Sequence, residues 1–145
     1  MKSNAFLDRS FQLATFFAMT AWLGIFVAPS WVLSNLTLVA IPVTLLCLLY
    51  TLTLLLGGQF DQQTHAPRGH FFSMSGVLKL FEHPRAVLVG WIHFLAFDLV
   101  VGLGILFDAS AQGYEHWWIL PSLFLTLMLG PAGLLSYLGL RLMLG

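Results

Sequence analysis

Hydrophobic residues run along this chain in four long segments, separated by shorter and more polar stretches. The segments cover residues 11–28, 36–56, 86–107 and 117–144. A helix needs about 20 apolar residues to cross a bilayer, and each segment reaches or approaches that length. The pattern therefore predicts an all-α membrane bundle of four transmembrane helices, which form a single domain over residues 1–145.

The one long connection, residues 57–85, has two parts of different character. Its first part, GGQFDQQTHAPRGH, is polar and rich in turn residues, which is typical of a loop. Its second part places apolar residues three and four positions apart, as one face of a helix does. These residues are Phe71, Met74, Val77, Leu78 and Phe81. We expect a short helix over residues 71–81 that lies in the membrane interface; the alternative is an irregular loop held by its aromatic side chains.

The composition supports a membrane protein and excludes other classes. Of the 145 residues, 59% are hydrophobic and 8% are charged, whereas soluble domains carry about 25% charged residues. The basic and acidic residues cancel to a net charge of zero, so no global field attracts nucleic acid. The single cysteine, Cys47, cannot form an internal disulfide. The chain is therefore expected to have lipids as its natural surroundings.

The basic residues indicate the orientation of the predicted bundle. They lie before the first segment, between the second and third, and at the end of the fourth: Lys2, Arg9, Arg68, Lys79, Arg85 and Arg141. Because loops rich in Lys and Arg stay in the cytoplasm, we expect both termini and the 57–85 connection to be cytoplasmic. Trp31, Trp117 and Trp118 would then lie at the opposite interface, where tryptophans are enriched.

Two ionisable residues stand in the third segment, in the stretch GWIHFLAFDLVVGLG. Asp98 is near the middle of a predicted helix about 33 Å long, and therefore near the bilayer centre. A charge there costs about 2.5–3.5 kcal/mol on insertion scales, so Asp98 must be protonated or face a partner inside the bundle. His93 lies about 7.5 Å earlier along the axis and about 140° around it. The two side chains do not stack directly, but they could flank one cavity between helices.

Two interpretations of Asp98 are compatible with this pattern. As a functional group, it forms with His93 a buried acid/base pair that acts on a ligand. As a structural group, it accepts hydrogen bonds from hydroxyls on other helices. The available donors are Thr15, Thr20, Thr44, Thr51, Thr53, Thr126 and Ser136. Proton conduction by the pair would require an oligomer, because four helices in one protomer make a poor pore.

The residues around the pair provide surfaces for an apolar ligand. Helical positions place two aromatic residues and a glycine on the Asp98 side, and a further aromatic residue nearer His93. A glycine in a membrane helix lets another backbone or a ligand approach closely. The candidate ligand contacts on this helix are Trp91, Phe94, Phe97 and Gly102.

The fourth segment carries a proline in the stretch LGPAG. Pro131 is expected to kink the helix and to free carbonyl groups for a ligand; a purely architectural kink is the alternative. No histidine spacing fits a metal site, and the chain has no HExxH, CxxC or glycine-rich phosphate loop. The sequence therefore predicts neither a metal nor another cofactor.

Two stretches of the chain resemble a known family. WIHFLAFDLVVG, residues 91–102, followed by Asp108, and LPSLFLTLMLGPAGLLSYL, residues 120–138, are similar to the abscisic-acid-deficient-four-like membrane proteins. The ten-residue spacing from Asp98 to Asp108 and the histidine five residues before Asp98 fit the family pattern. Leu103 departs from it, because family members often carry an arginine at this position. Plant members of the family are required for neoxanthin synthesis.

The resemblance implies a specific chemistry. Conversion of violaxanthin to neoxanthin opens an epoxide and forms an allene, which is a redox-neutral isomerisation. It requires an acid for the epoxide oxygen and a base for the proton on the neighbouring polyene carbon. The resemblance thus implies Asp98 as the acid and His93 as the base of a cofactor-independent isomerase; the reverse assignment of the two roles is the alternative. It also adds Asp108 to the candidate ligand contacts.

The resulting expectation is a multi-pass protein of a bacterial cell membrane, since no transit-peptide-like extension precedes the first segment. Its partners would be membrane lipid and a carotenoid or another apolar isoprenoid, without nucleic acid, and a homo-oligomer is compatible with the pattern. The alternative function is a non-catalytic membrane scaffold or subunit. In that case Asp98 and His93 make polar contacts between helices.

Overall fold

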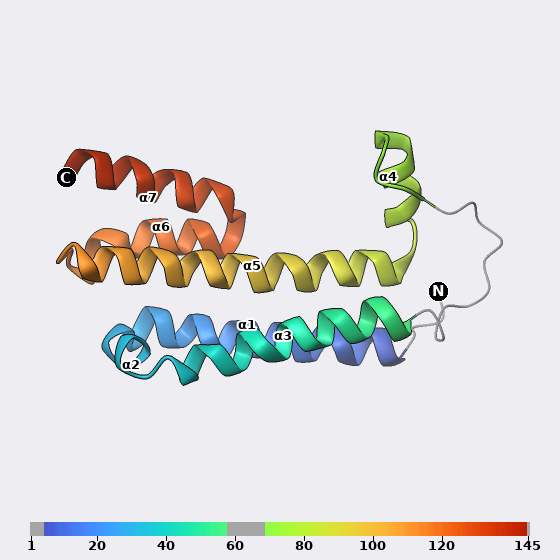
Figure 1. Ribbon diagram of the computed structural model, residues 1–145, viewed down its shortest axis with the longest axis horizontal. Helices are drawn as coiled ribbons and strands as arrows, with labels where there is room; N and C mark the ends of the chain where they lie inside the picture. Colours follow the sequence, from blue (N-terminus) through green and yellow to red (C-terminus); the bar gives the residue numbers. More distant parts are fainter. Residues whose placement is uncertain (1–4, 58–68, 145) are drawn as a thin grey trace.

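The computed structural model describes residues 5–57 and 69–144, and these residues form seven α-helices and no strand. The prediction of an all-α protein is confirmed. The helices are α1 (Ala5–Val27), α2 (Pro29–Ser34), α3 (Thr37–Leu56), α4 (Met74–Phe81), α5 (Pro84–Ala111), α6 (His116–Leu129) and α7 (Pro131–Leu144). Figure 1 shows α5 between the pair α1 and α3 on one side and the pair α6 and α7 on the other.

Among the described residues, three helices are long and apolar enough to cross a membrane: α1, α3 and α5. They correspond to the first three predicted segments. Small residues on α1 (Ala14, Ala18 and Ala21) are buried, which allows the helices to pack closely. Trp22 fills the centre of this core, and its ring lies against Gly102 of α5. The aliphatic and aromatic packing of these three helices holds α5 as the central element.

The structure differs from the predicted fourth transmembrane helix, residues 117–144. α6 ends before Gly130, and α7 starts at Pro131 and runs back alongside α6, so the two helices form a hairpin (Figure 1). The hydroxyl of Ser136 donates a hydrogen bond of 2.7 Å to the hydroxyl of Ser122 across the hairpin. Each arm has 14 residues, or about 21 Å, which is too short to cross a bilayer of about 30 Å.

The physical reason for the reversal is the Gly130–Pro131 pair. Gly130 has a φ of +41°, a conformation that favours glycine and ends α6. Pro131 has no N–H to continue α6, and its restricted φ suits the first turn of the next helix. Close packing of the two arms also needs Gly133, where a Cβ would collide with the backbone of Thr126. The expected kink at Pro131 is therefore replaced by a turn.

The hairpin changes the position of the C-terminal helix. α1 and α5 begin at one end of the bundle, whereas α7 ends at the opposite end, beside the connection between α5 and α6 (Figure 1). Arg141 accordingly pairs with Asp108 near the end of α5, about 35 Å along that helix from Arg85. The prediction that both termini and all basic residues share one side is not confirmed. Lys2 and Arg68 lie outside the described residues.

The predicted interfacial helix corresponds to α4, which begins at Met74 rather than at Phe71. The Ser73 hydroxyl caps its N-terminus by accepting a hydrogen bond of 3.1 Å from the Gly76 N–H. α4 runs across the end of α5 rather than along it (Figure 1), which is the arrangement expected of a helix in the membrane interface. Most of the polar loop before it, residues 58–68, lies outside the described residues.

Candidate functional site: a buried carboxyl under a helical hairpin

Asp98 lies near the middle of α5 and is buried, with 7% of its surface exposed. The turn of the α6–α7 hairpin contacts its carboxyl directly, because a Cβ on Gly130 would overlap the Oδ1 atom. The Oδ2 atom is buried and has no hydrogen-bond partner among the described residues. Buried polar atoms are almost always hydrogen-bonded, since an unsatisfied one costs free energy. Asp98 is therefore the strongest candidate for a functional group in the described part of the chain.

Four of the hydroxyl groups that were candidate partners of Asp98 bond elsewhere, and two others, those of Thr15 and Thr53, are buried without a partner in the described chain. Thr126, on the arm of the hairpin that packs against α5, donates to the carbonyl of Ser122 at 2.8 Å. Ser136 donates to Ser122 and to the carbonyl of Gly133. Two further candidates donate to carbonyls of their own helices: Thr20 and Thr51. Within the described ranges no hydroxyl clamps Asp98, so the structural interpretation in that form is not supported.

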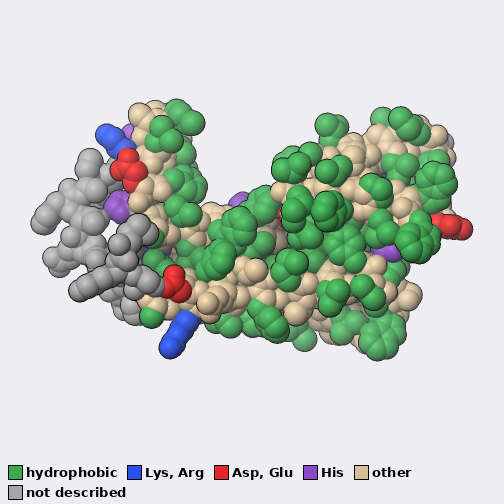
Figure 2. Space-filling view, turned by 180° about the vertical axis from the view of Figure 1, so that it is seen from behind, with side chains coloured by type: hydrophobic (Ala, Val, Ile, Leu, Met, Phe, Trp, Pro, Cys, Tyr) green, Lys and Arg blue, Asp and Glu red, His purple; other side chains and the backbone are tan. Residues whose placement is uncertain are grey.

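Aromatic side chains follow α5 from Asp98 towards α4. Phe94 and Trp91, four and seven residues before Asp98, stack with their ring centroids 5.7 Å apart. Trp91 also stacks on Phe11 of α1 at 5.9 Å and is 40% exposed. The apolar surface of the molecule is hollowed between α4 and the α6–α7 hairpin, over this stretch of α5 (Figure 2). Trp91 and Phe94 thus share a flank of α5 with Asp98, as their helical positions predict.

The structure does not bring His93 and Asp98 together. The His93 side chain is exposed, and its ring stacks on Phe97 at a centroid distance of 4.4 Å. The same ring lies 5.9 Å from the ring of Tyr50 on α3. His93 therefore faces the α3 flank of α5, whereas Asp98 faces the hairpin. Phe97, which is 59% exposed, belongs to the His93 surface.

Three other positions that the sequence singled out have clear structural surroundings. Gly102 is buried, and a Cβ there would collide with the ring of Trp22, so the close approach at this glycine is that of another side chain. Pro131 is the first residue of α7 and helps to hold the turn against Asp98. Leu103 packs against the hydrophobic core.

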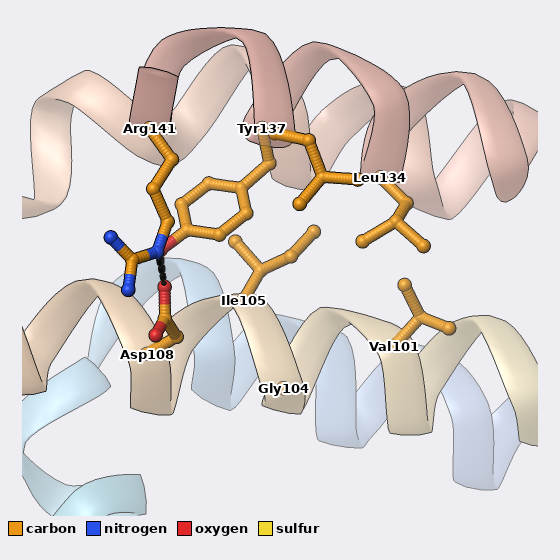
Figure 3. A pocket seen from close by; sticks show the side chains of 8 residues that line it. Val101, Gly104, Ile105, Asp108, Leu134, Tyr137 and Arg141 are labelled. Atoms are coloured by element: carbon orange, nitrogen blue, oxygen red, sulfur yellow. Dashed lines mark hydrogen bonds and ion pairs between the residues drawn. The ribbon is translucent and has the colours of Figure 1, made fainter. Parts of the chain in front are cut away.

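Asp108 forms a second polar cluster, about 15 Å along α5 from Asp98. Its Oδ2 atom accepts a hydrogen bond of 2.5 Å from the Tyr137 hydroxyl and lies 2.7 Å from Nε of Arg141. The cluster connects α7 to α5 at one end of a cleft between these helices (Figure 3). The sequence pattern singled out Asp108 but did not indicate Tyr137 and Arg141 as its partners, because their positions depend on the reversal at Gly130. The available signal in the sequence was Arg141, a basic residue near the end of an apolar segment, which needs an acidic or polar partner.

The fold and these sites define an α-helical, multi-pass membrane protein with a buried carboxyl at the centre of a spanning helix. Within that class, the chain belongs to the ABA DEFICIENT 4-like family, whose model matches residues 9–137. The resemblance found in the sequence is thereby confirmed. The matched region includes Asp98, Asp108 and the hairpin turn. No curated protein and no solved structure matches the chain significantly.

Proposed function

We propose that the protein binds a carotenoid-like or other isoprenoid lipid and isomerises it by redox-neutral acid/base chemistry at Asp98. The observation that carries the proposal is the buried Oδ2 atom of Asp98, to which no described residue bonds. An oxygen atom of a ligand would satisfy it, because a protonated carboxyl donates a hydrogen bond. Membership of the ABA DEFICIENT 4-like family supports a polyene ligand.

The substrate would reach Asp98 from the lipid. The hollow between α4 and the hairpin has apolar walls, and α5 forms its floor. A long polyene lying along α5 would contact the stacked rings of Trp91 and Phe94, since aromatic faces are large apolar surfaces that stack on flat groups. One end group of the ligand would then lie at Asp98, under the turn of the hairpin, where the protein excludes water from the reacting atoms.

For an epoxide substrate, the proton transfers balance without an added reagent. Neutral Asp98 donates its proton to the epoxide oxygen, the C–O bond breaks, and the oxygen becomes a hydroxyl. A base then removes a proton from the neighbouring polyene carbon, and the C–H electron pair forms the new double bond of the allene. The Asp98 carboxylate left by the first step is such a base, and by accepting this proton it returns to its neutral form.

His93 is the base that the family resemblance implies, and this role stays a prediction. Its ring is exposed on the α3 flank and stacks on Phe97. His93 lies near Tyr50 of α3, whereas Asp98 contacts the turn of the hairpin. Their separation supports the mechanism in which Asp98 carries both proton transfers.

A second candidate function is that of a non-catalytic membrane scaffold or subunit. The observation that favours it is the contact of Asp98 with Gly130 at the start of α7. Through this contact, the side chain of Asp98 would hold the turn of the hairpin against α5. An amide at position 98 would preserve much of this contact.

The test is purification of the protein and its variants from a carotenoid-producing bacterial host. Bound pigment is measured by absorption and mass spectrometry, and turnover is measured with an epoxidised carotenoid in detergent. We expect pigment in the wild type, and a folded Asp98→Asn variant whose turnover falls by about 10²-fold or more, the contribution typical of an acid/base group. Glu82→Gln, which changes an exposed carboxyl after α4, is the matched control and should retain pigment and turnover.

Two results would count against the proposal. If Asp98→Asn has wild-type properties in every assay, the scaffold is the better interpretation. If the wild type is colourless and inactive, and Asp98→Leu affects only folding, the isomerase is excluded and Asp98 serves the structure.

A further inference from the structure

We propose that the cleft between α5 and α7 is a second ligand site, which takes a zwitterionic phospholipid with a primary-amine headgroup. The cleft has a volume of about 340 Å³ and is open along its side. Asp108, Tyr137 and Arg141 line one end, and the lining between Val101 and Leu134 is apolar (Figure 3). The site is distinct from the proposed polyene site and does not depend on it.

The polar end of the cleft lies at the depth of lipid headgroups. Asp98 is near the midpoint of α5, and Asp108 is ten residues further along the helix, which is a rise of about 15 Å. This distance is half the thickness of a hydrocarbon core of about 30 Å. Val101 lies about 10 Å deeper than Asp108. The cleft therefore extends from the headgroup level into the acyl-chain region of one leaflet.

The charges at the polar end complement a zwitterion. Tyr137 and Nε of Arg141 both contact Oδ2 of Asp108, which leaves Oδ1 of Asp108 and the terminal nitrogens of Arg141 without a partner in the described chain. Both charged side chains are accessible, at 36% for Arg141 and 38% for Asp108. A phosphate would accept hydrogen bonds from Arg141, and a primary ammonium would donate to Asp108. A purely anionic headgroup would instead meet the carboxylate of Asp108.

Gly104 keeps the apolar part of the cleft open. It lines the cleft together with Val101 and Ile105, yet a Cβ built on it meets no atom within 4 Å. The facing surface of α7 presents Leu134 and Leu138. These side chains provide the apolar contacts that an acyl chain makes, and a larger residue at position 104 would fill the space that the chain needs.

The proposal is tested by native mass spectrometry of the delipidated, detergent-purified full chain. Palmitoyl-oleoyl phosphatidylethanolamine, phosphatidylcholine and phosphatidylglycerol are added separately, so that only the headgroup changes. We expect one phosphatidylethanolamine to bind the wild type, and Gly104→Leu to weaken its binding about tenfold or more because the larger side chain occupies the cleft. Gly139→Leu is the matched control, because Gly139 lies on α7 outside the cleft and its Cβ also meets nothing within 4 Å. It should bind as the wild type does.

Two polar variants test the headgroup contacts in proteins whose folding is verified by thermal unfolding. Arg141→Gln should weaken phosphatidylethanolamine and phosphatidylcholine alike, because both contain the phosphate. Asp108→Asn should reduce the preference for phosphatidylethanolamine over phosphatidylcholine, since a quaternary ammonium cannot donate a hydrogen bond. Tighter binding of phosphatidylglycerol, displacement of the phospholipid by a hydroxylated carotenoid, or unchanged binding in Gly104→Leu and Arg141→Gln would each overturn the proposal. These readouts do not involve turnover, so they are separate from the test at Asp98.

Discussion

The carboxyl of Asp98 and the backbone of Gly130 are in direct contact, and this contact joins the centre of α5 to the turn between α6 and α7. Glycine suits position 130 for two reasons. The backbone there has a φ of +41°, and a Cβ would overlap the Oδ1 atom of Asp98. Asp98 is the one buried carboxyl of the described helices that are long enough to span a membrane, and the turn packs directly against it. The contact also holds the hairpin that determines where α7 ends.

Gly130→Ala is expected to destabilise the protein by about 1–3 kcal/mol, because an L residue is strained at this φ and its Cβ overlaps Asp98. Unfolding of the detergent-solubilised protein by heat or denaturant measures the effect. In the double variant with Asp98→Ala, the cost should fall, since the overlap is removed and only the strain remains. Gly139→Ala is the control and should be neutral or slightly stabilising. Equal stability of the two glycine variants would contradict the observed turn.

Gly102→Ala is expected to cost about 1–3 kcal/mol, because the added methyl overpacks the core against Trp22. Trp22→Phe in the same chain should recover part of this cost by making room. The comparison is with Gly104→Ala, where the structure leaves open space. If Gly102 is instead a ligand contact, Gly102→Ala will lose bound pigment while its unfolding stays unchanged.

The C-terminus is expected on the side of the membrane opposite to α4. Lys79 and Arg85, at the junction of α4 and α5, favour the cytoplasmic side for that end of the bundle. Fusions of alkaline phosphatase or green fluorescent protein at residue 113 and at the C-terminus measure the sidedness of each position. Both alkaline phosphatase fusions should be active and both fluorescent fusions dark. Opposite results at the two positions would mean that residues 117–144 cross the membrane once.

His93→Leu is expected to retain turnover within about threefold of the wild type, while Asp98→Asn loses about 10²-fold or more. The reason is that His93 lies on the α3 flank beside Phe97 and does not share the hairpin surface of Asp98. Initial rates with an epoxidised carotenoid, measured on folded variants, provide the comparison. A loss in His93→Leu as large as in Asp98→Asn would make His93 the base.

The sequence by itself determined the helical class and located the three segments that form helices long enough to cross a membrane, although it also predicted a fourth. It also singled out Asp98 as a candidate functional residue. A long apolar segment in lipid has few alternatives to an α-helix, because the helix hydrogen-bonds every backbone polar group within the segment itself. Asp98 stood out since a carboxyl at the centre of such a segment is costly. Helical positions also placed Trp91 and Phe94 on its flank, because residues four and seven apart share a face whatever surrounds the helix.

Only the tertiary structure decided what covers Asp98 and which residues join Asp108. A glycine followed by a proline inside an apolar stretch is compatible with a kink or with a reversal, and the φ of Gly130 selects the reversal. That single turn brings Gly130 to Asp98 and Arg141 to Asp108. The neighbours that His93 and Asp98 face, α3 and the hairpin turn, were also beyond the sequence pattern. Lipid and neighbouring helices are equally apolar, so hydrophobic periodicity does not reveal which flank of a membrane helix faces which neighbour.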